Sequence, residues 1–194
     1  MGVEHDRSRF EHLFGSYQRQ IFAYCLRRTS TYADAEDATA DAFAVAWRRR
    51  DAAPDPNAAL PWLYAIARRT LANQRRVRDR QARLPARLEP PGSDLAPLGD
   101  ASGPAVDALE RLRPDDQELL RLVAWEELRH DEIAEVLGIT ANAVAIRLHR
   151  ARVRFEQELR ATSSPHDVKE IEGRRTSTRL KGRMIGLLRR ESSE

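Results

Sequence analysis

The 194-residue chain has a single cysteine, Cys25, and no long apolar run. One thiol excludes an internal disulfide and a cysteine-based metal cluster. No stretch approaches the roughly 20 apolar residues of a membrane-spanning helix, and the first ten residues lack the basic-then-apolar order of a secretory signal. We therefore expect a cytoplasmic protein with no membrane insertion. We also expect Cys25, which falls on an apolar helical stripe, to be a buried and unreactive thiol.

The chain also lacks a phosphate-binding glycine loop, a cluster of carboxylates for metal ions and a nucleophile–base arrangement. These absences argue against an enzyme, so we expect no catalytic residue, no metal and no cofactor. The composition is instead rich in charge, with 32% charged residues and a formal net charge of +3. The arginines are clustered along the chain, and clustered basic residues indicate a polyanionic partner.

Helical periodicity, with no convincing strand pattern, dominates the first 83 residues. The first segment runs from about residue 7 to 28, with an apolar stripe of Phe10, Leu13, Phe14, Tyr17, Ile21, Tyr24 and Cys25. The second runs from about 33 to 50 and is expected to bury Ala35, Ala38, Ala42, Phe43, Ala46 and Trp47. Its other side carries an acidic row of Asp34, Asp37 and Asp41.

A proline-rich break, DAAPDPNAALP, predicts a loop, and Pro61 suits the first turn of a third helix that reaches about residue 83. The inner face of this helix is expected to hold Leu63, Ile66, Ala67, Thr70, Gln74 and Val77. Seven arginines stand against one aspartate between residues 62 and 83, and the face opposite the core carries Arg68, Arg69, Arg75 and Arg76. This composition favours binding to a polyanion, with a merely solvated helix as the alternative.

Residues 84–104 are rich in Pro, Gly, Ser and Asp and have no helical period, which predicts a flexible linker. Helical pattern resumes at Val106 and restarts at Pro114, with Asp115 and Asp116 where the helix dipole favours acids. The sequence therefore predicts an all-α fold of two small helical domains, 1–83 and 105–161, joined by the linker and followed by a basic tail, 162–194.

Residues 128–155 carry the pattern of a helix-turn-helix in the second domain. A short helix ends at Gly138, which can adopt the positive φ of a tight turn. Thr140 is placed to cap a longer helix, one face of which carries Val144, Leu148, Ala151, Phe155 and Leu159. A rotation of about 100° per residue puts Asn142, Ile146, His149, Arg150 and Val153 opposite that face, with Ala145 and Arg147 on its flanks.

The exposed face of the longer helix is predicted to enter the major groove of DNA. Arginine and asparagine can each make two hydrogen bonds to a base edge, whereas Ile146 can offer only an apolar contact, for example to a thymine methyl group. A helical hairpin that binds no nucleic acid is the alternative.

The order of these elements resembles that of the extracytoplasmic-function sigma factors, over about residues 7 to 160. DAEDATADAFAVAWRRR looks like the polymerase-docking helix of their region two, and LPWLYAIARRTLANQRR looks like their promoter-melting helix. LERLRPDDQELLRLV, the helix-turn-helix and AIRLHRARVRF look like their region four. The linker length also fits that family.

The resemblance implies a protein that binds core RNA polymerase and directs promoter recognition and transcription initiation at a specific set of genes. Asp34, Asp37 and Asp41 would then face the clamp helices of the largest polymerase subunit, and region four would contact the flap of the second-largest subunit. The resemblance also implies an anti-sigma factor as a candidate partner.

For promoter DNA, the resemblance implies that the third helix binds the separated strand of the minus-ten element, through Arg68, Arg69, Asn73, Arg75 and Arg76. The longer helix of the second domain would bind the minus-35 element. Trp62 and Tyr64 are candidate stacking platforms, although packing in the core is the favoured interpretation, and the loop at 55–59 is a weaker candidate for capturing a base. Many family members have polar or basic residues where this chain has Ala145 and Ile146, so no base preference is predicted.

Three other classes of protein compete with this interpretation. A dimeric helix-turn-helix regulator would leave the acidic row and the arginine-rich helix unexplained. A nucleic-acid-processing enzyme would need a site that the chain lacks, and an adaptor would bind proteins alone.

The tail segment HDVKEIEGRRTSTRLKGRMIGLLRR has eight basic residues against three acidic ones. Three glycines weaken its helical pattern, so we expect it to be largely disordered, with helix near 180–190 only against a partner surface.

Overall fold

The computed structural model describes residues 2–82 and 103–162, and all the regular structure in these two ranges is helical. The chain divides into two compact units, which confirms the predicted all-α, two-domain architecture. The predicted linker at 84–104 and the tail at 162–194 lie almost wholly outside the described residues, so their boundaries stay predictions.

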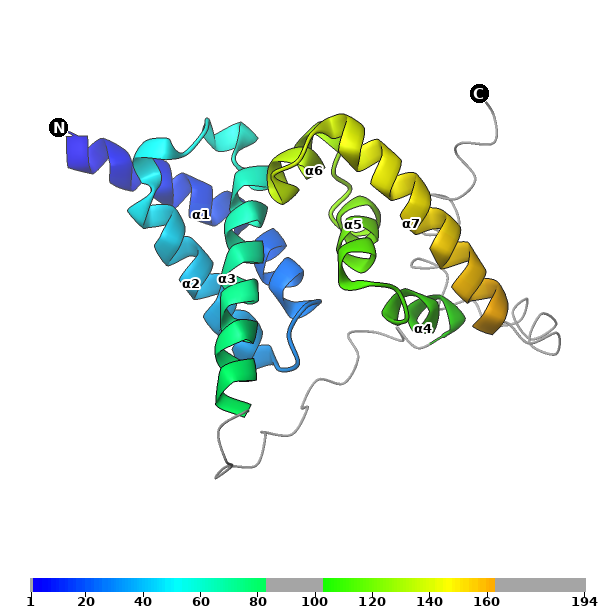
Figure 1. Ribbon diagram of the computed structural model, residues 1–194. Helices are drawn as coiled ribbons and strands as arrows, with labels where there is room; N and C mark the ends of the chain where they lie inside the picture. The colour runs from blue at the N-terminus through cyan, green and yellow to red at the C-terminus, as the bar shows by residue number, and fades with distance from the viewer. Residues whose placement is uncertain (1, 83–102, 163–194) are drawn as a thin grey trace, which may run out of the picture. The chain divides into compact units, whose positions relative to one another are not determined.

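The first unit is built from three helices that each pack on the other two: α1 (Gly2–Leu26), α2 (Tyr32–Arg48) and α3 (Leu60–Ala82) (Figure 1). Two short 3-10 helices, η1 (Arg50–Ala52) and η2 (Pro56–Ala58), lie between α2 and α3. Thr31 caps α2, since its hydroxyl oxygen accepts a hydrogen bond from the Asp34 N–H at 3.0 Å. The core residues of the unit include Ile21, Tyr24, Ala35, Ala38, Ala42, Phe43, Leu63, Ile66 and Ala67.

The burial predicted for Trp47 is wrong, because 36% of this residue is exposed. Trp47 lies in the last turn of α2, at the surface of the unit, where it contacts partly exposed side chains and not the core. The Phe10 ring packs edge-on against it at 5.0 Å, and the Arg50 guanidinium lies 4.9 Å from its centroid. Phe14 and Val77, also predicted on inner faces, are 38% and 37% exposed.

Cys25 is fully buried on α1, as predicted. Burial raises the pKa of its thiol, and this effect outweighs the opposing hydrogen bond with the Thr39 side chain and the charges of Arg28 and Arg27. A thiol with a raised pKa holds little of the reactive thiolate at neutral pH.

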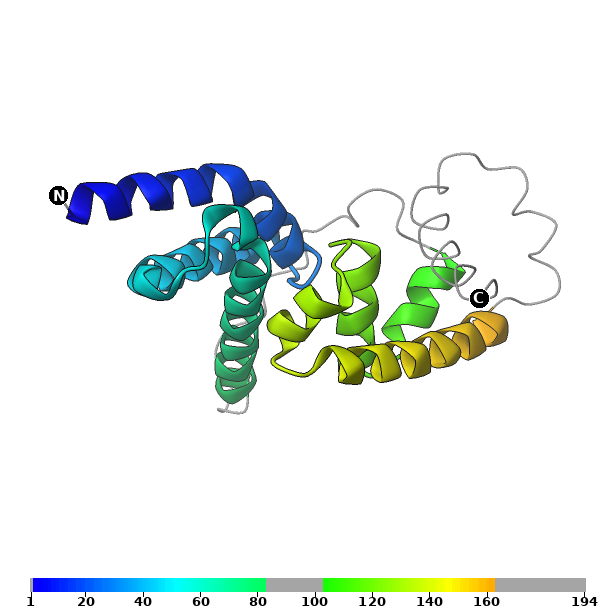
Figure 2. The ribbon, with the colours of Figure 1, turned by 90° about the horizontal axis from the view of Figure 1, so that it is seen from above.

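The second unit contains α4 (Pro104–Glu110), α5 (Pro114–Ala124) and the long α7 (Ala141–Thr162), and α6 (His130–Leu137) directly precedes α7. Both α4 and α5 pack on α7 and lie on the same side of it (Figure 2). The predicted stripe of α7 faces this core, and four of its five members are buried: Val144, Leu148, Ala151 and Phe155. Leu159, the fifth, is only partly buried.

Candidate nucleic-acid interface

The turn between α6 and α7 has the geometry that the sequence predicts. Gly138 adopts a φ of 68°, and the Ile139 N–H donates to the Ala134 carbonyl at 3.0 Å. The Thr140 hydroxyl accepts from the Ala143 N–H at 3.2 Å and its carbonyl accepts from the Val144 N–H at 3.0 Å, so Thr140 caps α7. These contacts confirm the predicted helix-turn-helix.

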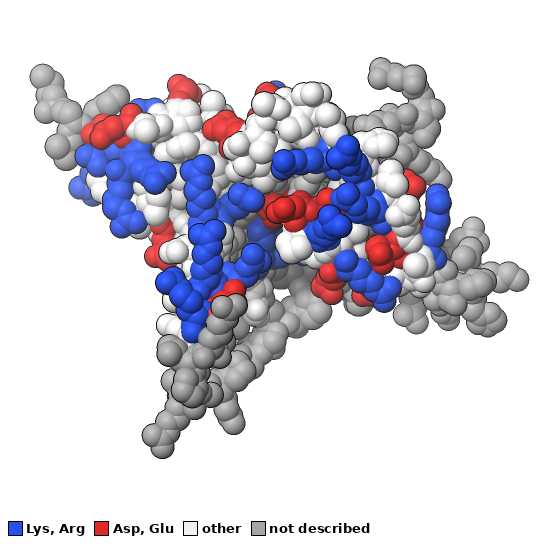
Figure 3. Space-filling model, viewed as in Figure 1, with Lys and Arg blue, Asp and Glu red and all other residues white. Residues whose placement is uncertain are grey.

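The outer face of α7 presents the side chains that the helical projection places there. Asn142, Ile146, Arg147, His149 and Arg150 are exposed, whereas Ala145 is partly buried. Ile146 is 47% exposed and Val153 is 43% exposed, and both are on this outer face. Basic side chains gather over this helix in Figure 3. The face therefore combines positive charge with two exposed apolar side chains.

An ion pair between α5 and α7 lies behind this face. The Arg154 guanidinium donates to the Asp116 carboxylate at 2.7 Å, and the two side chains are 40% and 12% exposed. The sequence places Asp116 where the helix dipole favours an acid, but it gives no sign of a partner 38 residues away. The pair thus joins α7, which carries the candidate DNA-binding face, to α5.

The basic face of α3 is also largely open to solvent. Arg69, Asn73, Arg75 and Arg76 are exposed, and Arg68 is partly buried. In Figure 3 blue side chains run along much of this helix, with few acids between them. Such a row is suited to the phosphates of a nucleic-acid strand.

The loop before α3 is tied to α1 by long-range hydrogen bonds. Arg9 donates to the carbonyls of Ala53 and Pro54, both at 2.8 Å, and the Tyr17 hydroxyl donates to the Pro56 carbonyl at 2.8 Å. Sequence reasoning assigned no role to Arg9, because partners more than 40 residues away leave no trace in helical periodicity. The Tyr17 bond reaches the loop at 55–59 that the sequence offers as a base-capturing element, and the two Arg9 bonds hold the residues just before it.

The two candidate stacking residues of α3 differ in exposure. Tyr64 is 3% exposed and its ring lies 5.0 Å from that of Tyr24, so it packs in the core, as favoured from the sequence. Trp62 is partly buried. It lines a small pocket with side chains from α1, α2 and the following loop, among them Asp6, Arg9, Phe10, Leu13, Ala46, Arg50 and Ala53.

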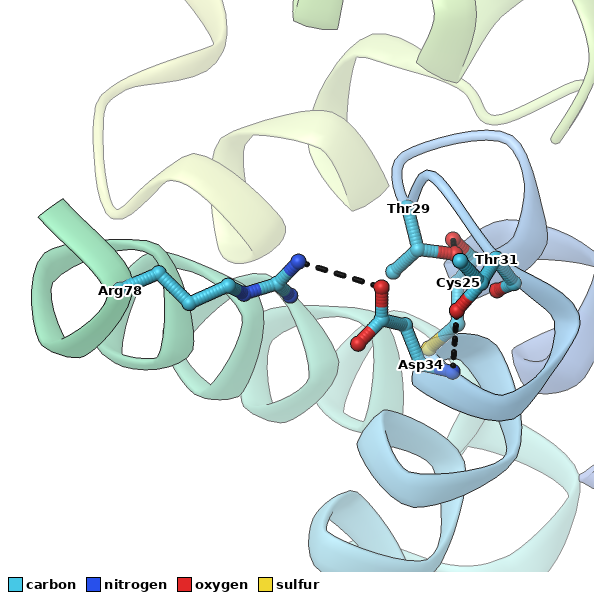
Figure 4. Close-up of polar contacts among 5 residues, drawn as sticks. All are labelled: Cys25, Thr29, Thr31, Asp34 and Arg78. Carbon is cyan, nitrogen blue, oxygen red and sulfur yellow. Dashed lines mark hydrogen bonds and ion pairs between the residues drawn. The ribbon is translucent and has the colours of Figure 1, made fainter. Parts of the chain in front are cut away.

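The acidic row of α2 is partly paired with α3. The Arg78 guanidinium donates to the Asp34 carboxylate at 3.2 Å (Figure 4), and the Gln74 amide donates to Asp41 at 3.1 Å. Asp37, between them on the helix, is exposed and forms no hydrogen bond or ion pair within residues 2–82 and 103–162. The acids thus form one surface, but two of the three already have a partner.

Sequence reasoning assigned no role to Arg78. Its spacing of four residues from Gln74 places both side chains on the α2-facing side of α3, and its spacing of three residues from Arg75 puts it at the edge of the main arginine face. That spacing is the only local signal, since the pairing with Asp34 spans 44 residues.

In the part of the chain that the structure describes, no group of three His, Cys, Asp or Glu side chains could hold a metal ion. Within the same residues, no helix combines the length and apolar character that crossing a membrane requires.

Two family models match the two units in order. The model for Sigma-70 region 2 matches residues 13–81, and the model for Sigma-70 region 4 matches residues 103–155. Together the two matches cover more than half of the chain.

Relatives that match about three quarters of the chain are named RNA polymerase sigma factors. The chain is 26% identical to the RNA polymerase sigma factor YlaC of Bacillus subtilis, over 79% of this chain and 93% of that protein. It is 29% identical to the RNA polymerase sigma factor CarQ of Myxococcus xanthus, over 77% and 88%. It is 26% identical to the ECF RNA polymerase sigma factor SigG of Mycobacterium tuberculosis over 72% of this chain, but it spans only 46% of SigG.

Two solved structures share the fold. The sigma factor RpoE of Bartonella quintana, solved in complex with the anti-sigma factor NepR, matches with a TM-score of 0.61 and 23% identity, over 78% of this chain and 96% of that chain. CnrH, solved in complex with the cytosolic domain of CnrY, matches with a TM-score of 0.54 and 24% identity, over 79% and 89%.

Proposed function

The chain belongs to the extracytoplasmic-function family of RNA polymerase sigma factors, and we propose how its two units divide the work of promoter recognition. The protein binds core RNA polymerase and directs promoter recognition and transcription initiation at a specific set of genes. The first unit docks on the polymerase and binds the minus-ten element, and the second unit binds the minus-35 element.

One observation carries this proposal. The first unit exposes an acidic row and a basic face, the second unit exposes a basic face on its helix-turn-helix, and these surfaces follow the order that the family requires. The acidic row of α2 lies beside the basic face of α3 in the region-two match, and the outer face of the helix-turn-helix follows in the region-four match. A protein that only bound duplex DNA would have no use for the acidic row.

Three surfaces of the protein perform these steps. The acidic row docks on the clamp helices of the largest polymerase subunit, and Asp37 is its exposed member with no hydrogen bond or ion pair among the described residues. The basic face of α3 holds the separated minus-ten strand through Arg68, Arg69, Asn73, Arg75 and Arg76. The outer face of α7 binds the minus-35 duplex through Asn142, Ala145, Ile146, Arg147, His149 and Arg150.

The protein contributes no catalytic group in this proposal, because the polymerase performs the chemistry. It acts in the cytoplasm, where polymerase and chromosome meet. The second unit also contacts the flap of the second-largest subunit. An anti-sigma factor is a further candidate partner, since the similar sigma factor RpoE was solved with one.

Run-off transcription tests the function directly. Core polymerase and sheared genomic DNA from the source organism are incubated with and without the protein, and transcript 5′ ends are sequenced. We expect a discrete set of 5′ ends that depends on the protein. If the protein binds DNA but no such ends form, it is a regulator and not a sigma factor.

The docking surface is tested by exchanging Asp37 and Asp41 for lysine. Reversal of two charges on the docking row should weaken co-purification with core polymerase, because a surface complementary to the row now repels it. The matched control is the double change Glu36→Lys and Asp51→Lys, which alters the same charge at exposed acids outside the row. Equal core binding by the two folded double variants contradicts the assignment.

A further inference from the structure

Arg78 lies between two binding surfaces of the first unit. Its guanidinium donates to Asp34 of the acidic row, with side-chain exposures of 47% for Arg78 and 32% for Asp34. On α3 it follows Arg75 and Arg76 by less than one turn, beside the basic face. Figure 4 shows the long Arg78 side chain reaching from α3 toward the start of α2.

The position of Asp34 is fixed by the cap of α2. Its N–H donates to the Thr31 hydroxyl at 3.0 Å, and Thr29 in turn donates to the Thr31 carbonyl at 3.4 Å. The backbone of Asp34 is therefore held in place and its side chain is short, whereas Arg78 is an exposed side chain with several rotatable bonds. Of the two partners, Arg78 is the one that can move to another acceptor without a change in the backbone.

We propose that Arg78 is a further DNA-binding residue that Asp34 holds in the free protein and that polymerase docking releases to a phosphate of the promoter strand. This inference rests on the proposed function, since it needs the acidic row to be the polymerase surface. A polymerase surface that binds this row presents positive charge to Asp34. That charge replaces the Arg78 guanidinium as the partner of the Asp34 carboxylate. The released side chain then lies beside Arg75 on the DNA-facing side of α3.

Polymerase and DNA binding become linked through this one pair. Docking frees a cation for DNA, and DNA that binds Arg78 frees an anion for polymerase. The two effects must be equal in size, because coupling between two binding events is reciprocal. A partly exposed ion pair limits the effect to about two- to fivefold at low salt.

The test is a double-mutant cycle on the full chain, with fluorescence anisotropy of a labelled single-stranded DNA oligonucleotide at about 0.05 M and about 0.5 M salt. In the free protein, Asp34→Asn should raise DNA affinity about two- to fivefold at low salt. The same change in an Arg78→Ala background should raise it no more than Glu36→Gln does, which removes one charge from an exposed acid elsewhere on α2. The difference should fade at high salt.

The second arm uses the complex with core polymerase. Arg78→Ala should lower the affinity of that complex for the oligonucleotide, whereas Asp34→Asn at saturating core should no longer raise it. Arg80→Ala is the matched control on α3, since the Arg80 side chain donates to the Arg76 carbonyl at 3.2 Å and not to an acid. Its effect on DNA binding should be the same with Asp34 or Asn at position 34.

Two results overturn the inference: equal effects of Asp34→Asn and Glu36→Gln in the free protein, or an unchanged DNA affinity of the polymerase complex with Arg78→Ala. Both leave the proposed function intact as long as the parent chain binds core and starts transcripts. A parent chain that binds no core polymerase contradicts the proposed function itself.

Discussion

Ile146 lies near the centre of the outer face of α7, where a DNA-reading helix would meet base edges. With Val153, it is one of two large apolar side chains that are exposed in the described part of the second unit. It cannot hydrogen-bond a base, so its available contact in the major groove is with the C5-methyl group of thymine. Ile146 is therefore expected to distinguish thymine from uracil.

The test uses minus-35 duplexes from the promoters that run-off transcription identifies, with thymine replaced by uracil one position at a time. Loss of one methyl contact should weaken binding of the polymerase complex by about 0.8 kcal/mol, about fourfold, at the contacted position. Ile146→Ala should abolish that difference while Arg150→Ala should weaken binding to both duplexes alike. An unchanged thymine-to-uracil ratio with Ile146→Ala would exclude the contact.

An ion pair with a mostly buried carboxylate joins α7 to α5. Arg154 and Asp116 form this pair, and Asp116 is only 8% exposed. Asp116→Ala should lower the free energy of opening of the second unit by about 1–2 kcal/mol, less than for a fully buried pair because Arg154 can be rehydrated. Hydrogen exchange of the α7 amides measures this value in the intact chain.

Asp116 also lies in the first turn of α5, where the helix dipole favours it. The double variant Asp116→Ala with Arg154→Ala separates the ion pair from the effect of the helix dipole. Each single variant loses the pair, but only Asp116→Ala also loses the acid in the first turn of α5. Glu156→Ala is the control: it removes an exposed pair with Arg160 and should cost less than about 0.5 kcal/mol. Equal exchange rates for Asp116→Ala and Glu156→Ala would show that the pair does not hold α7.

The elements that the sequence predicts well are those set by local rules. Gly138 and Thr140 act within one turn of their own backbone, so the limits of the helix-turn-helix could be derived without the structure. The exposed and buried faces of α7 follow from its rotation per residue in the same way. The chemistry of the outer face was therefore available from sequence.

Tertiary pairing is what the sequence could not supply. The contacts of Arg78 with Asp34 and of Arg9 with the loop carbonyls join residues more than 40 positions apart, and charge periodicity gives each arginine many possible partners. Trp47 shows a related limit. Its position on the apolar stripe is correct, but burial depends on where the neighbouring helices end, and it lies in the last turn of α2.

At the scale of the whole molecule, the two units are small and each offers a limited surface to DNA. The proposed function joins them on one polymerase, where binding of the first unit raises the effective concentration of the second at its promoter element. Each unit can then bind weakly without loss of promoter selection. This arrangement requires both units and the chain between them, and it gives no part to residues after α7.

Removal of residues 163–194 should therefore leave promoter-directed transcription close to that of the full chain. A cut after Thr162 keeps all of α7, including the 3.0 Å hydrogen bond from Arg111 to the Thr162 hydroxyl. A second cut after Arg154 is the control, since it also removes Phe155, which is 1% exposed in the core, and should unfold the second unit. The readouts are run-off transcription, core co-purification and helix content. If the chain cut after Thr162 folds and binds core polymerase yet starts no transcripts, the basic tail takes part in initiation, and the division of work between the two units is incomplete.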